Sequence, residues 1–86
     1  MATGQEAEAL ALEALVWILQ EQPRAERFMT LTGITADELR VGLGTRGVQA
    51  AVLEFLASHE PDMLAAAEAL DVSPDALAAA GRMLSA

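Results

Sequence analysis

The stretch that decides how this chain folds is Ile34-Thr35-Ala36-Asp37-Glu38-Leu39. Thr35 followed three residues later by Glu38 is a capping box, in which each side chain accepts a hydrogen bond from the backbone N–H of the other residue. Ile34 and Leu39 flank the box as a hydrophobic staple, which fixes the angle at which the chain enters the helix. The sequence therefore predicts a helix that starts directly after Thr35.

A second stretch of the same kind, Val72-Ser73-Pro74-Asp75-Ala76-Leu77, lies 38 residues further on (72 minus 34). Ser73 is its N-cap and Pro74 suits the first helical position, but Ala76 stands where a capping box needs Glu. Few other residues are identical at this offset. Ancestral duplication and convergent use of the same cap chemistry therefore both stay open.

The pattern of apolar, cap and break residues predicts six short helices. Their expected ranges are about 5–21, 23–32, 36–41, 48–58, 61–70 and 74–85. Gly33 is expected to end the second helix in the left-handed conformation. The predicted fold is all-α, a compact bundle of five to six short helices, arranged as two pseudo-repeated three-helix units if the repeat is real. We expect a single helical domain over residues 1–86, with any disorder confined to the first few residues and the tail.

The first predicted helix is apolar around most of its circumference. Its apolar rows are Leu10/Ala14/Trp17, Ala11/Leu15/Ile18 and Leu12/Val16/Leu19, against one polar row of Glu6, Glu13 and Gln20. Such a helix must lie centrally in the bundle or be covered by another protomer. For Trp17 we favour a buried position, with an exposed anchor for a partner as the alternative.

Composition narrows the classes of function. The 86 residues include no cysteine, so disulfides, thiolate metal sites and a cysteine nucleophile are excluded, and a cytoplasmic location is expected. The longest apolar run, residues 10–19, is too short to span a bilayer, and no basic cluster precedes it. The net charge is −8, with no basic residue in residues 1–23 or 54–75. An acidic surface of this kind suits a basic protein partner and repels nucleic acid.

Two motifs resemble functional signatures without their context. Residues 42–47, Gly-Leu-Gly-Thr-Arg-Gly, spell the dinucleotide fingerprint but follow a predicted helix instead of a strand, so we interpret them as a flexible linker. The helix, Gly33 turn and helix after Thr35 resemble a helix-turn-helix, but that second helix offers one base, Arg40, beside two acids. Nucleic-acid binding is therefore the least favoured hypothesis.

No combination of residues predicts catalysis. His59, the one histidine, is interpreted as a solvated or capping residue, and the serines lie at helix ends and the tail. We expect no enzyme activity, no catalytic residue, no cofactor and no metal site.

The favoured hypothesis is a non-enzymatic module for protein–protein interaction or assembly, with a protein partner or self-association and no nucleic acid, membrane or metal. The alternative is a helical domain that binds a small anion or ligand. Either function could use the same candidate contact residues, Arg24, Arg27, Arg40 and Arg46.

Three segments carry a family resemblance: Leu10-Ala11-Leu12-Glu13-Ala14-Leu15, residues 27–34 and residues 51–56. With them, the chain from about Glu8 to Leu84 resembles domain-of-unknown-function family 3572, a family of short uncharacterised bacterial helical proteins. The resemblance implies the helical fold and no catalytic residue. Gln22 and Asp71 stand where the family pattern has Asp and Gly. Asp71 is thereby expected to take, at a cost, a turn conformation that Gly adopts freely.

Overall fold

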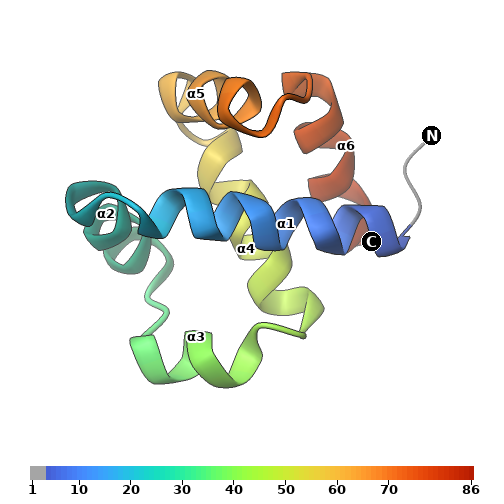
Figure 1. The fold of residues 1–86 in the computed structure, drawn as a ribbon. Helices are drawn as coiled ribbons and strands as arrows, with labels where there is room; N and C mark the ends of the chain where they lie inside the picture. The colour runs from blue at the N-terminus through green and yellow to red at the C-terminus, as the bar shows by residue number, and fades with distance from the viewer. Residues whose placement is uncertain (1–3) are drawn as a thin grey trace.

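Six α-helices form residues 4–86, the part of the chain that the computed structural model describes (Figure 1). They are α1 (Gly4–Leu19), α2 (Gln22–Thr32), α3 (Ala36–Gly42), α4 (Arg46–Ala57), α5 (Glu60–Leu70) and α6 (Pro74–Ser85). The all-α prediction is confirmed, and each helix begins and ends within about two residues of its expected range. The expectation of disorder at the first residues falls partly on residues 1–3, which lie outside the described residues. No helix in residues 4–86 combines the length and the apolar character needed to cross a membrane.

Both predicted caps are present. The Thr35 Oγ1 atom accepts a hydrogen bond from the backbone N–H of Glu38 at 3.1 Å, and the Glu38 carboxylate accepts one from the N–H of Thr35 at 3.3 Å. The Ser73 hydroxyl accepts from the N–H of Ala76 at 3.0 Å. These bonds satisfy donors that the first helical turn leaves without an intrahelical partner, and they fix where α3 and α6 begin.

Two helices end in a left-handed residue. Gly33 closes α2 with φ 75° and Asp71 closes α5 with φ 57°, and Asp71 is the one non-glycine residue with positive φ in residues 4–86. Glycine adopts this conformation without a Cβ penalty, whereas another L-residue loses about 1–2 kcal/mol there. The predicted strain at Asp71 is therefore present in the fold.

Helix α1 lies across the middle of the molecule and packs against α2, α4, α5 and α6 (Figure 1). Its buried face is Ala7, Ala11, Ala14, Leu15 and Ile18. The three alanines let α6 and α4 approach closely, while Leu15 and Ile18 join the larger core side chains that the other helices contribute. Among them, Phe28 of α2 and Phe55 of α4 meet edge to face, with ring centroids 5.3 Å apart. Of the two positions expected for the first helix, central in the bundle or covered by another protomer, the structure shows the central one.

Hydrogen bonds stabilise the connection between α3 and α4. The Thr45 Oγ1 atom donates to the carbonyl of Gly42 at 2.7 Å and accepts from the N–H of Val48. The buried Gln49 side chain donates through Nε2 to the carbonyl of Leu43 at 3.1 Å. The residues predicted as a flexible linker do connect two helices, but they form a short bonded turn, and α4 begins at Arg46 because Thr45 caps it.

Candidate functional site

Arg24 joins the end of α1 to the start of α2. Its guanidinium carbon lies 3.6 Å from the ring centroid of Trp17, and its Nη1 atom pairs with Glu21 at 2.7 Å. Its Nη2 atom donates to the backbone carbonyl of Trp17. The same carbonyl lies in the last turn of α1, where helix carbonyls lack intrahelical donors, and it also accepts from the backbone N–H of Gln20 at 3.3 Å, so Arg24 supplies a second donor. Trp17 is half-buried beneath Arg24, which is intermediate between the buried position and the exposed anchor considered from the sequence.

Arg27 faces the start of α5. Its Nη2 atom donates to Oδ2 of Asp62, and the same oxygen lies 3.0 Å from Nδ1 of His59. Its guanidinium group also lies 5.6 Å from the ring centroid of Phe55. The Asp62 side chain is only 12% exposed, so this contact ties α2 to α5. Arg27 is thus held by a carboxylate of its own chain.

The other two candidate arginines, Arg40 and Arg46, lie on α3 and at the start of α4. Arg40 is 76% exposed on α3 and lies 3.4 Å from Asp37 one turn earlier, an exposed pair that contributes little. Arg46 is the first residue of α4, and its Nη2 atom lies 4.0 Å from where a Cβ on Gly4 would be. Arg46 is exposed at this position.

The structure therefore does not bring the four candidate arginines into contact with one common group. Arg24, Arg27 and Arg40 each pair with a different carboxylate, and Arg46 lies near the start of α1. A small anion gains most where several guanidinium groups converge on it. The observed arrangement supports packing and helix connection by Arg24 and Arg27 more directly than anion binding.

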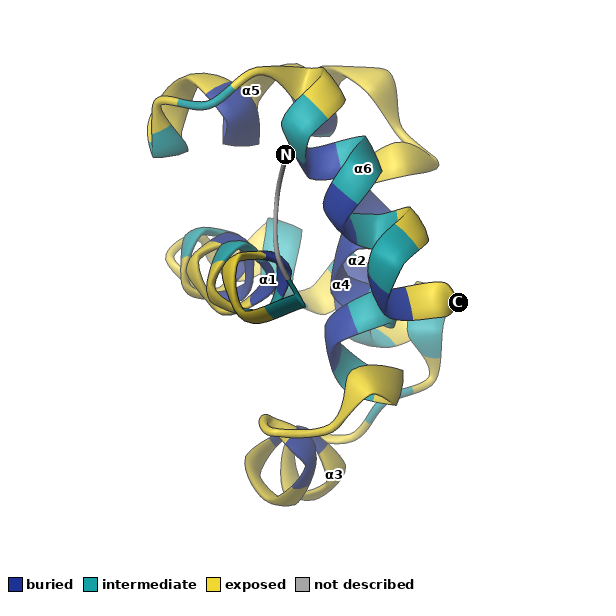
Figure 2. Ribbon diagram, turned by 90° about the vertical axis from the view of Figure 1, so that its right-hand side faces the viewer, coloured by how far each residue is buried: buried dark blue, intermediate teal, exposed yellow. Residues whose placement is uncertain are grey.

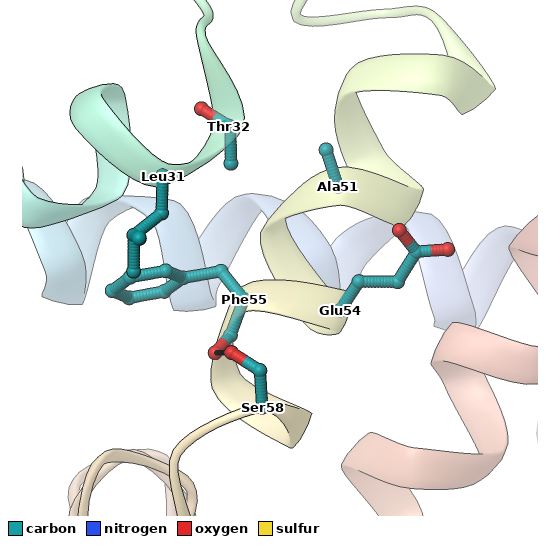
Figure 3. A pocket seen from close by; sticks show the side chains of 6 residues that line it. All are labelled: Leu31, Thr32, Ala51, Glu54, Phe55 and Ser58. Carbon is teal, nitrogen blue, oxygen red and sulfur yellow. Dashed lines mark hydrogen bonds between the residues drawn. The ribbon is translucent and has the colours of Figure 1, made fainter.

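A shallow pocket of about 350 Å³ lies between α2 and α4 (Figure 3). Leu31 and Phe55 lie close together in it, and the Glu54 carboxylate lies on the other side. The Thr32 and Ser58 hydroxyls donate to the backbone carbonyls of Phe28 and Phe55, so neither offers its proton to a ligand. Because its one charged lining residue is Glu54, the pocket does not suit an anion.

Metal binding has no support in residues 4–86. No group of three or more histidine, cysteine, aspartate or glutamate side chains converges there. Asp62 and His59 lie side by side, but Asp62 is already bonded to Arg27.

The most distinctive surface feature lies on α1. We call Leu12, Val16 and Leu19 the α1 stripe. These side chains are 39%, 59% and 42% exposed, and their spacing of four and three residues places them on one face of the helix. The sequence identified this row as apolar but did not distinguish it from the two rows that are buried or half-buried. Only the position of the neighbouring helices makes that distinction.

The family model described as "Protein of unknown function (DUF3572)" matches residues 4–86. Neither a curated protein nor a solved structure matches the chain significantly. The match extends over all six helices, as the resemblance implied.

Proposed function

This chain belongs to the DUF3572 family, whose description names no activity, and we propose that it is a non-enzymatic module that binds another protein through the α1 stripe. One observation carries the proposal: three large aliphatic side chains are exposed together on one face of the helix that is otherwise central to the core. The −8 net charge and the lack of cysteine fit a protein that works in the cytoplasm.

The stripe differs from the other exposed apolar residues. Leu31, Val41, Leu43 and Leu64 are also exposed, but they belong to α2, α3, the turn after α3 and α5. Single exposed aliphatic residues are normal on protein surfaces, whereas contiguous ones mark contact sites. In the α1 stripe, by contrast, each successive turn of the helix exposes one large aliphatic side chain to solvent.

Small-anion binding has weaker support. Three of the four candidate arginines already pair with carboxylates, which leaves Arg46 as the guanidinium group best placed to accept a ligand. A single exposed guanidinium group binds an anion weakly in water. Phosphate titration followed by NMR at Arg46 separates the two functions, since the interaction module predicts no shift change there.

Site-specific photocrosslinking tests the proposal. A photoreactive residue replaces Val16 in cells that encode the protein, and a control places it at Leu64, which is 51% exposed on α5. We expect a discrete crosslinked protein at position 16 and not at position 64. Equal products at both positions, or none at position 16, would contradict the proposal.

A further inference from the structure

We infer that the α1 stripe binds a basic amphipathic helix, which packs along α1 as one strand of a short coiled coil. This inference rests on the proposed function and names the class of partner. The exposed apolar residues on α1 have the spacing of a coiled-coil seam, and acidic residues lie beside them.

The exposed apolar residues of α1 follow a heptad pattern. Ala9, Leu12, Val16 and Leu19 are all exposed, and their spacings of three, four and three residues give positions a, d, a and d. A β-branched residue at a with leucine at d favours two-stranded pairing. Val16 and its flanking leucines have this arrangement. The seam covers residues 9–19, about 16 Å along the helix axis at 1.5 Å per residue.

Acidic residues flank the seam at the positions that select a partner. In this register Glu8 is a g residue and Glu13 is an e residue, and e and g side chains form the ion pairs between coiled-coil helices. Glu13 is exposed and Glu8 is half-buried, and neither has an ion pair with another residue of the described part of the chain. Residues 1–23 contain no lysine or arginine. The partner must therefore bring the positive charge.

Charge also argues against a second copy of this chain as the partner. In a parallel pair, the g residue of one helix faces the following e residue of the other, so Glu8 would face Glu13 of the second copy twice. An antiparallel pair sets e against e and g against g, which again brings acids together. Each copy also carries a net charge of −8. A helix with lysine or arginine at e and g removes this repulsion and replaces it with attraction.

The seam is short, so the expected binding is weak and depends on salt. A contact of one and a half heptads buries less than a standard interface. The ion pairs at its edges are exposed, so affinity should fall as the ionic strength rises.

Two designed peptides test the inference. Both carry valine at a and leucine at d over about four heptads, and they differ only in having lysine or glutamate at every e and g position. Each peptide repels its own copies, so its helicity should rise only when it finds a complementary strand. Titrated into isotope-labelled protein, the lysine peptide should shift the methyl signals of Leu12, Val16 and Leu19, and the glutamate peptide should bind at least tenfold more weakly.

Charge reversal supplies the matched control. The Glu8→Lys/Glu13→Lys variant should prefer the glutamate peptide, whereas Glu60→Lys/Glu68→Lys, which changes the same charge on exposed positions of α5, should keep the preference for lysine. Val16→Glu should weaken binding of the lysine peptide at least tenfold. Val41→Glu, at a valine that is 86% exposed on α3, should leave it within about twofold.

The outcomes separate this inference from the proposed function. If neither peptide binds, or if the two charge-reversed variants behave alike, a basic helix is not the partner. Sedimentation that shows a dimer which Val16→Glu dissociates would identify a second copy as the partner, so the proposed function would stand while this inference fails. If Val16→Glu leaves the affinity for the lysine peptide unchanged, the peptide binds elsewhere on the acidic surface, and the inference is overturned. If position 16 also yields no crosslinked protein, the proposed function fails as well.

Discussion

Helices α3 and α6 begin in the same way and differ in what they contact. Each follows a helix that ends in a left-handed residue, and each starts from a hydroxyl cap, Thr35 or Ser73. Yet α6 packs against α1, α4 and α5, whereas α3 packs appreciably only against α4. Figure 2 shows α3 at the foot of the molecule, exposed on most of its surface.

The difference begins where the two helices stop matching in sequence. Leu39 and Leu77 correspond at the 38-residue offset (77 minus 39) and both are buried. One turn later Ala80 is matched by Gly42, and another turn later the buried Leu84 is matched by the exposed Arg46. Helix α6 therefore continues as a buried face over 12 residues, while α3 ends after seven. A cap fixes where a helix begins, and the apolar residues beyond it decide what the helix packs against.

Replacing the shared leucine gives the largest expected contrast. Leu77 is fully buried on a helix that packs against three others, so Leu77→Ala should lower the free energy of unfolding by about 3–4 kcal/mol. Leu39→Ala should lower it by about 1–2 kcal/mol, because α3 has one main neighbour and the site can relax. Urea unfolding followed by Trp17 fluorescence measures both. Equal losses would show that α3 is as deeply integrated as α6.

Gly42 provides the next test, at the position where the two helices diverge. A Cβ at Gly42 would lie 2.8 Å from Cγ2 of Val48, closer than packed atoms tolerate. Gly42→Ala should therefore destabilise the protein by about 1–2 kcal/mol, although alanine has the higher helix propensity.

Val48→Ala supplies the control for this clash. It removes the atom that the new Cβ meets, so Gly42→Ala should cost less in the Val48→Ala background than in the wild type. The comparison is made by urea unfolding of all four proteins. If the cost is the same in both backgrounds, steric overlap is not what keeps glycine at this position.

The helices and their ends were predictable from the sequence because their causes are local. The Thr35–Glu38 box, the Ser73 cap and the Gly33 end depend on residues within one turn of each other. The position of α3 was not predictable, since it depends on contacts between distant segments. The bonded turn after α3 was also missed, because Gln49 resembles an ordinary polar surface residue until Leu43 is placed beside it.

The candidate site was hard to predict for the same reason, because its contacts join segments that are distant in the sequence. Arg24 and Arg27 were named from the sequence as candidate contact residues, but their partners Trp17 and Asp62 lie on other helices and could not be paired with them from sequence. The apolar row of Leu12, Val16 and Leu19 was visible as a pattern. Its exposure depends on where α2, α4, α5 and α6 cover α1.

The two caps should have similar local effects and different global ones. Ser73→Ala should lower the free energy of unfolding by about 1 kcal/mol, since α6 is part of the main core. Thr35→Ala removes a comparable bond, but α3 can fray while the other helices stay packed. Hydrogen exchange should therefore become about fivefold faster at the α3 amides, with little change in the urea midpoint. A matching loss of global stability in both variants would contradict this separation.

The smallest expected effect concerns the two left-handed residues that precede these caps. Asp71→Gly should stabilise the protein by about 0.5 kcal/mol, because relief of the strained φ of 57° exceeds the extra freedom that glycine brings to the unfolded chain. Gly33→Asp should destabilise it by a similar or slightly larger amount, and since no atom lies within 4 Å of a Cβ built there, the effect is conformational. Thermal and urea unfolding of the single variants and the double exchange measure this directly. If the two turns are equivalent, the variant with both exchanges should have nearly the stability of the wild type. A large difference in stability between that variant and the wild type would mean that Asp71 contributes through its side chain and not only through its backbone.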